Sequence, residues 1–213
     1  MTGKVIFTAT MAATLLTLGA LAQDKKPAPA QAQTKTAAQA PVMDAKQKAA
    51  MEAMAKAGAV GEPHKKLAEM AGNWEATVKM WQGPGEPQIS KGTAEVTVEL
   101  GGRFIKEYFK SSFEDQPFEG FSYTGYDNVS KKYTAVWLDS TGTGIMIGTG
   151  TMDTAGKVYT GTNTYNDPMT GKSHTSKEVV RYTDKNNHTM EMYDKGPDGK
   201  EFKMMEIVYK RVK

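Results

Sequence analysis

Short runs of residues with a hydrophobic period of two make up most of the chain from Trp74 onward. In Lys91–Leu100, for example, alanine, valine and leucine alternate with threonine and glutamate. Successive side chains of a β-strand point to opposite faces, so this alternation is typical of an antiparallel sheet with one buried and one wet face. The pattern predicts ten strands: Trp74–Trp81, Lys91–Leu100, Arg103–Ser111, Phe118–Tyr126, Lys132–Asp139, Gly144–Met152, Val158–Asn166, His174–Thr183, His188–Tyr193 and Glu201–Val212.

The connections between these runs are short and consist of turn-forming residues, as in Gly83-Pro84-Gly85. None is long enough for the crossover helix that parallel strands need, which excludes a parallel sheet. Hairpin-sized connections favour a closed barrel over a two-sheet sandwich, so we predict a mainly β fold, an antiparallel up-and-down β-barrel of about ten strands. In Arg103–Lys110 and Glu201–Val212, apolar residues occupy both phases, and the pattern does not assign their inward faces.

The first 22 residues have the features of a secretory signal peptide. Lys4 is followed by an apolar stretch, and Ala20-Leu21-Ala22 offers small residues to a signal peptidase, with cleavage expected before Gln23. The stretch is short and interrupted by threonines, and no charged stop-transfer cluster follows it, so no membrane span is expected after cleavage. We therefore expect an exported chain, either periplasmic or secreted.

The segments between the signal peptide and the strands differ in composition. Residues 23–42 are rich in Ala, Gln, Pro and Lys and are predicted to be a disordered linker, because they hold too little apolar surface to offset the entropy of ordering. Residues 43–62 form a helical Ala/Met-rich segment. A second, short helix, with Pro63 in its first turn and Gly72 at its stop, is expected to cap the barrel domain of residues 63–213.

Composition narrows the partners and the chemistry. The chain has 27 Lys and Arg against 24 Asp and Glu, a balance that does not predict nucleic acid or an anionic membrane as a partner. It has no cysteine, which removes a lipoprotein anchor, disulfides, thiol catalysis and thiolate metal sites. A membrane barrel is also disfavoured, because lysine and glutamate recur along the predicted strands.

Gly72-Asn73-Trp74 lies between the short helix and the first strand, and it resembles the Gly-x-Trp opening of calycin barrels such as lipocalins, fatty-acid-binding proteins and nitrobindins. That resemblance implies that Gly72 and Trp74 close one end of the barrel. Five further motifs, in this order, are similar to the bacterial domain-of-unknown-function family numbered 1579: Gly101-Gly102-Arg103-Phe104, Phe118-Glu119-Gly120, Gly125-Tyr126-Asp127, Tyr133 with Trp137-Leu138-Asp139-Ser140, and Pro197-Asp198-Gly199-Lys200. The match runs from about Leu67 to the C-terminus and implies a calycin-like barrel, with no established activity or ligand.

A barrel of about ten strands is expected to enclose a cavity lined by apolar and aromatic groups with a few polar anchors. The candidate ligand-binding residues are Arg103, Tyr126, Tyr133, Trp137 and Asp139. Arg103 has two interpretations. It either holds a ligand carboxylate in the lumen or packs as a cation–π lid over the closing tryptophan.

Histidine and methionine give little support for a metal or haem site. The chain has three histidines, and no pair has the spacing that would put two ligands on one face. His188 is the one weak metal candidate, because it alternates in phase with Met190 and Met192 and all three could face the lumen. Nitrobindins hold haem by one histidine close to the C-terminal end of the barrel. The last strand of this chain, residues 202–209, has no histidine, and His188, one strand earlier, is the nearest substitute. The methionines are interpreted as cavity or core filler, and no cofactor is predicted.

No set of catalytic residues is predicted. Asp127 and Asp139 end adjacent antiparallel strands and would lie at opposite ends of a hairpin, and Ser140 has no histidine near it in sequence. The favoured function is therefore an exported barrel that binds a small apolar or amphipathic ligand without catalysis. The alternatives are a filled barrel acting as a structural or protein-interaction module, haem binding of nitrobindin type and, with least support, an enzyme.

Overall fold

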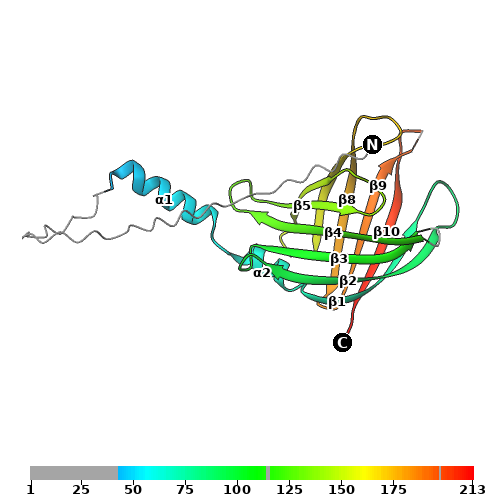
Figure 1. Cartoon of the computed structure of the whole chain (residues 1–213), viewed down its shortest axis with the longest axis horizontal. Coiled ribbons are helices and arrows are strands. Elements are labelled where there is room, and N and C mark those ends of the chain that lie inside the picture. The colour runs from blue at the N-terminus through cyan, green and yellow to red at the C-terminus, as the bar shows by residue number, and fades with distance from the viewer. Residues whose placement is uncertain (1–42, 114–115, 197) are drawn as a thin grey trace, which may run out of the picture. The chain divides into compact units, whose positions relative to one another are not determined.

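The computed structural model describes residues 43–113, 116–196 and 198–213 (Figure 1). The predicted signal peptide and the linker of residues 23–42 lie outside the described residues. The elements are α1 (Ala45–Ala57), α2 (Glu62–Ala68), β1 (Gly72–Met80), β2 (Gln88–Glu99), β3 (Phe104–Phe113), β4 (Gln116–Asp127), β5 (Lys132–Asp139), β6 (Met146–Met152), β7 (Val158–Asn166), β8 (Ser173–Asp184), β9 (Asn187–Lys195) and β10 (Glu201–Arg211).

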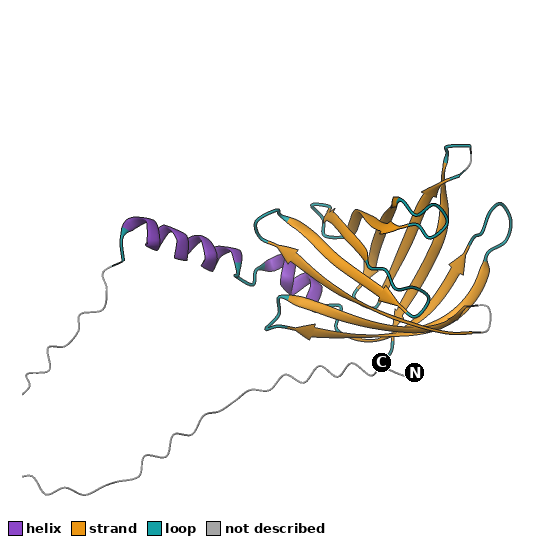
Figure 2. Cartoon of the chain, turned by 45° about the horizontal axis from the view of Figure 1, so that its top comes forward, coloured by secondary structure: helices purple, strands orange, loops and turns teal. Residues whose placement is uncertain are grey.

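The ten strands form a closed antiparallel barrel in which each strand pairs with its neighbours in the sequence (Figures 1 and 2). The barrel closes where β1 pairs with β10, with Trp74 opposite Arg211 and Met80 opposite Met205. The predicted up-and-down barrel is confirmed, and every predicted run coincides with a strand. The largest shift at a strand start is in β2, which begins at Gln88 and not at Lys91.

The two helices differ in how they contact the barrel. Helix α1 begins with a capping box, since the Asp44 side chain accepts from the Gln47 amide at 2.8 Å and the Gln47 side chain accepts from the Asp44 amide at 3.0 Å. None of its residues is buried. Helix α2 packs against β3 and β4 and buries His64 and Leu67 (Figure 2). It ends at Ala68, short of the predicted stop at Gly72, where β1 already begins.

The core lies inside the barrel, where inward side chains alternate with outward ones. On β1 the buried inward residues are Trp74, Ala76 and Val78. On β2 the predicted buried face extends only as far as Val96. Val98 and Leu100 continue the alternation but are 43% and 69% exposed, because β2 ends at Glu99 and the chain turns there.

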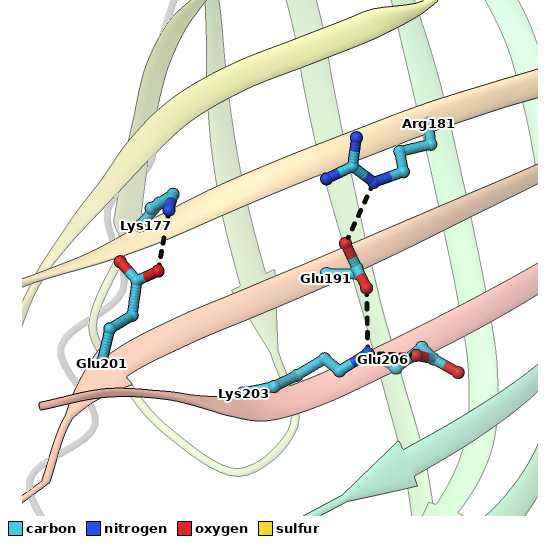
Figure 3. A network of polar contacts seen from close by, with 6 residues as sticks. All are labelled: Lys177, Arg181, Glu191, Glu201, Lys203 and Glu206. Carbon is cyan, nitrogen blue, oxygen red and sulfur yellow. Dashed lines mark hydrogen bonds and ion pairs between the residues drawn. The ribbon is translucent and has the colours of Figure 1, made fainter.

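The outward face of β8, β9 and β10 bears a network of ion pairs (Figure 3). Lys203 Nζ lies 2.9 Å from Glu191 Oε1 and also bonds Glu206, while Arg181 Nε is 3.3 Å from the other oxygen of Glu191. Lys79 extends the network onto β1 through Glu206 at 2.9 Å. This surface faces water, as charged side chains require.

Within the described part of the chain, no helix combines the length and the apolar character needed to cross a membrane.

Candidate functional site

Trp74 closes one end of the barrel. It is 2% exposed, and its indole Nε1 donates a hydrogen bond to the carbonyl of Met70 at 3.0 Å. The guanidinium carbon of Arg211 lies 4.1 Å from the centre of the Trp74 ring, which is a cation–π contact. A Cβ on Gly72 would lie 2.6 Å from the Arg211 guanidinium, and Gly72 has a φ of 133°, so the position requires glycine. Gly72 and Trp74 therefore occupy the closed end that the Gly-x-Trp resemblance implied.

The prediction that Arg103 covers this tryptophan is wrong. Arg103 is exposed, and its guanidinium donates to the carbonyls of Gly58 at 3.1 Å and Leu100 at 3.2 Å, so it faces a surface loop and not the lumen. Arg211, and not Arg103, covers the ring of Trp74. It is held there by the carbonyls of Glu69 and Lys185, at 2.7 and 3.0 Å.

His188 lies directly above Trp74, in an aromatic stack. Its ring is 4.4 Å from that of Tyr209 and nearly parallel to it, and 4.6 Å from Trp74 in an edge-on arrangement. Burial, together with the charge of Arg211, lowers the pKa of His188 from 6.5 to about 4, so the ring is neutral at physiological pH. His188 does face inward with Met190 and Met192. Among the described residues, however, no group of three or more His, Asp and Glu is arranged to hold a metal.

Above this aromatic end, a layer of polar side chains crosses the interior. Tyr209 on β10 donates its hydroxyl to Glu107 Oε1 on β3 at 3.1 Å. These strands are separated by β1 and β2, so the bond spans the lumen, over the small inward side chains of Ala76 and Ala94. On the facing wall, Asn163 Nδ2 of β7 donates to Glu178 Oε2 of β8 at 2.6 Å.

The two carboxyl groups of this layer are poorly hydrated and close enough to influence each other. Burial raises the pKa of Glu107 from 4.5 to about 7, against the opposing effect of the Tyr209 hydrogen bond, and the charge of Glu178 adds to the rise. Burial likewise raises the pKa of Glu178, which the hydrogen bond from Asn163 only partly offsets. Near neutral pH the layer is therefore partly protonated.

Ser176 adds an unsatisfied group to the same wall. It lies two positions before Glu178 on the inward face of β8, opposite Asn163 in the strand register, and is 2% exposed. Its hydroxyl has no hydrogen-bond partner among the described residues. A buried hydroxyl without a partner costs about 1–3 kcal/mol, so such a group calls for an occupant of the space it faces.

Two inward glycines make room for these side chains. A Cβ on Gly148 would come within 2.7 Å of the Asn163 amide oxygen, and one on Gly120 within 2.5 Å of the Trp137 ring. The amide and the indole therefore pack directly against the backbone at these two glycines.

The predicted aromatic residues form two groups at different heights. Tyr126 and Tyr133 contact each other edge-on at 5.0 Å, and Tyr126 also meets His64 of α2, which places this pair at the closed end. Trp137 lies farther along β5, stacked on Phe118 at 6.5 Å between ring centres.

Asp139 orients the second aromatic group. Its carboxylate accepts from the Trp137 indole at 2.8 Å and from the Thr141 amide at 2.9 Å. These bonds outweigh partial burial and lower the pKa of Asp139 below 3.8. Of the five candidate ligand residues, the structure thus joins Trp137 with Asp139 and Tyr126 with Tyr133, and separates Arg103 from both pairs.

The sequence analysis missed Glu107, Glu178 and Asn163. On β3, Glu107 follows Lys106 among apolar residues of both phases, so the strand pattern does not say which of the two charges faces inward. A usable clue existed on β8, where Glu178 is in phase with Val180.

Two solved structures that match this chain differ widely from it in sequence. The crystal structure of Rv2717c from M. tuberculosis matches with a TM-score of 0.55 and 13% identity, covering 73% of this chain and 100% of that one. A redesigned β-barrel matches with a TM-score of 0.37 and 13% identity, covering 70% and 96%. The first likeness supports the barrel fold alone. No curated protein matches the sequence.

A family-level match covers the whole barrel. The sequence model of the family described as "Protein of unknown function (DUF1579)" matches residues 59–211, which extend from just before α2 to the end of β10. This confirms the resemblance carried by the glycine and aromatic motifs. The chain belongs to the DUF1579 family.

Proposed function

We propose that this barrel binds a small amphipathic molecule in its lumen without catalysing a reaction on it, and that the chain is exported. The observation that carries the proposal is the polar layer, in which Glu107 and Glu178 face the interior beside the apolar core. Burying ionisable groups costs several kcal/mol, and groups with strongly shifted pKa values cluster at functional sites. A barrel whose interior served only as a packed core would gain more stability from apolar side chains in these positions.

The accessibility of inward side chains also favours a ligand over a filled barrel. Trp74, Tyr133 and Tyr209 pack the closed end and are buried. Beyond the polar layer, inward residues such as Trp137 and Met205 keep partial solvent access although they lie inside a closed barrel. The apolar part of a ligand would pack there, against Trp137, with its polar end at the carboxyl groups.

Haem binding has less support. An axial histidine needs open space beside its ring nitrogen for the iron and the macrocycle. The His188 ring instead lies 4.4 Å from Tyr209 and 4.6 Å from Trp74, within the packed closed end. Export, for its part, rests on Lys4, the apolar stretch after it and the Ala20-Leu21-Ala22 motif.

A lumen-filling substitution with an outward control tests the proposal. Ala135 faces inward on β5 opposite Gly148, while the preceding Thr134 is exposed on the outer face. We expect the wild-type protein to bind the neutral dye Nile red saturably. Ala135→Phe should abolish that binding while the barrel stays folded, and Thr134→Phe should leave it unchanged.

Export is tested by the mass of the same protein. Native mass spectrometry of protein recovered from the periplasm or medium should give the mass of a chain that begins at Gln23. Protein found only in the cytoplasm, with an intact N-terminus, would contradict export. Absence of saturable dye binding by the wild type would contradict the ligand site, as would Ala135→Phe unfolding the barrel by overpacking a lumen that is already full.

A further inference from the structure

We propose that the polar end of the ligand is a cation, an alkylammonium group held between the carboxylates of Glu107 and Glu178. The inference rests on the proposed lumen site and adds the charge of the molecule that enters it. Its basis is the distribution of charge across the barrel wall, together with the unpartnered hydroxyl beside Glu178.

Lysines and inward-facing carboxyl groups lie on opposite sides of the wall, although other carboxylates, such as Glu191 and Glu206, lie outside with the lysines. Glu107 and Glu178 occupy inward positions in the middle of the lumen, and Asp139 and Asp194 occupy inward positions nearer the rim. In the described strands every lysine lies on the outward face. Lys203 illustrates this, because the bulge that follows it turns its side chain outward to the Glu191 network.

The other basic groups near the lumen are already engaged or uncharged. The guanidinium of Arg211 already bonds backbone carbonyls and contacts the Trp74 ring at the closed end. His174 bonds Asp194 at 2.8 Å, and His188 is neutral at physiological pH. The described part of the barrel therefore supplies no cation to the two glutamates.

The hydrogen-bonding capacity of the layer is mostly that of acceptors. Each glutamate has one side-chain donor, Tyr209 or Asn163, although a carboxylate can accept about four hydrogen bonds. The Ser176 hydroxyl oxygen, 2% exposed and without a partner among the described residues, lies on the same inward face. An ammonium group has three donors and no acceptor, which fits this set.

The charges of the layer also favour a cationic ligand. The carboxyl of Glu178 raises the cost of ionising Glu107, since the charge of Glu178 adds to the raised pKa of Glu107. A cation placed between them would relieve that repulsion and would gain charge-assisted hydrogen bonds. A carboxylate ligand would add to the repulsion, and an alcohol would gain only neutral hydrogen bonds.

Three probes with the same tail and different head groups test the inference. Isothermal titration at about pH 8, where the alkylamine is still protonated and Glu107 is ionised, would compare decylamine, decanol and decanoate. We expect decylamine to bind at least about tenfold more tightly than decanoate, with decanol between them. Glu107→Gln and Glu178→Gln should each reduce the preference for the amine several-fold, with little change for decanol.

Glu95→Gln is the matched control. Glu95 is an exposed, outward residue of β2, and its substitution by glutamine removes the same charge from the molecule. It should leave the order and the affinities unchanged. Equal binding of all three probes, or preference for decanoate, would overturn the cation inference and leave the lumen site standing. Failure of all three to bind would overturn both. An equal effect of Glu95→Gln would assign the preference to net charge and overturn the inference.

Discussion

Glu107 and Lys106 are neighbours on β3, and the face that each occupies decides its chemistry. Lys106 points outward, with its ammonium 5.9 Å from the centre of the Phe121 ring, whereas Glu107 points inward to the hydroxyl of Tyr209. The carboxyl loses most of its hydration there, and the hydrogen bond from Tyr209 compensates only part of the loss. Glu107 should therefore contribute to how the stability of the protein depends on pH.

We predict that the stability difference between the wild type and Glu107→Gln changes with pH between about pH 4.5 and 7. In this window the folded protein keeps a proton that the unfolded chain releases, because the pKa of Glu107 rises from 4.5 to about 7 on folding. Relative to the variant, the wild type should therefore lose up to about 3 kcal/mol as pH rises through the window, with the loss complete above pH 7. His188 acts in the opposite sense in both proteins, because its pKa falls from 6.5 to about 4 on folding, so it cancels in this difference.

Urea unfolding at several pH values measures this difference, with Glu95→Gln as the control that should behave like the wild type. Glu178 contributes with the same sign as Glu107 and His188 with the opposite sign, and both contributions remain in Glu107→Gln. The turn carboxylates Asp127, Asp153 and Asp184 have pKa values below 3.8 and titrate outside the window. A slope equal to that of the wild type would show that Glu107 is well hydrated.

At the scale of the elements, the closed end depends on the last residue of β10. Arg211 joins the end of α2, the β8–β9 turn and the start of β1, because its guanidinium bonds the carbonyls of Glu69 and Lys185 and covers Trp74. Arg103, by comparison, bonds only exposed loop carbonyls. The two arginines have the same chemistry and different surroundings.

We predict that Arg211→Ala lowers the free energy of unfolding by about 3 kcal/mol, through the loss of the cation–π contact with Trp74 and of the charged hydrogen bonds to Glu69, Lys185 and the partly buried carbonyl of Ala71. Arg103→Ala should cost less than about 1 kcal/mol, since both of its bonds are exposed. Chemical denaturation of the two variants measures the difference. Equal losses would mean that Arg211 does not hold the barrel end together.

The elements were predictable from sequence because their determinants are local. The period of two and the turn residues placed all ten strands, and Gly72 and Trp74 marked the closed end. The role of Arg211 was not predictable in this way, because it depends on the pairing of the first strand with the last. The bulge between Lys203 and Met205 likewise reverses the inward phase within β10, which no alternation pattern records.

The candidate site was predictable only in part, for a related reason. Trp137, Tyr126 and Tyr133 are aromatic and stand out in the sequence, and they do face inward. Glu107 and Glu178 look like the solvent-exposed acids of any wet strand face until the phase of the strand is known. Asn163 gains its role from an inward glycine, Gly148, on the neighbouring strand.

At the scale of the whole molecule, the barrel has a packed end and a partly accessible remainder, with the strand lysines outside and the carboxyl groups of Glu107 and Glu178 inside. Methionine residues occur on both sides of this boundary and can report on it. Met190 and Met205 face the lumen, whereas Met54 of α1 and Met169 of the β7–β8 turn are 75% and 90% exposed. Their methyl groups have sharp NMR signals that are sensitive to a nearby aromatic ligand.

A titration of methyl-labelled methionine with Nile red, followed by NMR, therefore tests the central claim that the lumen is the binding site. The account predicts that the Met190 and Met205 signals shift in a saturable way, while those of Met54 and Met169 stay in place. Shifts confined to Met54 or Met169, or no shift at any methionine at saturating dye, would contradict it.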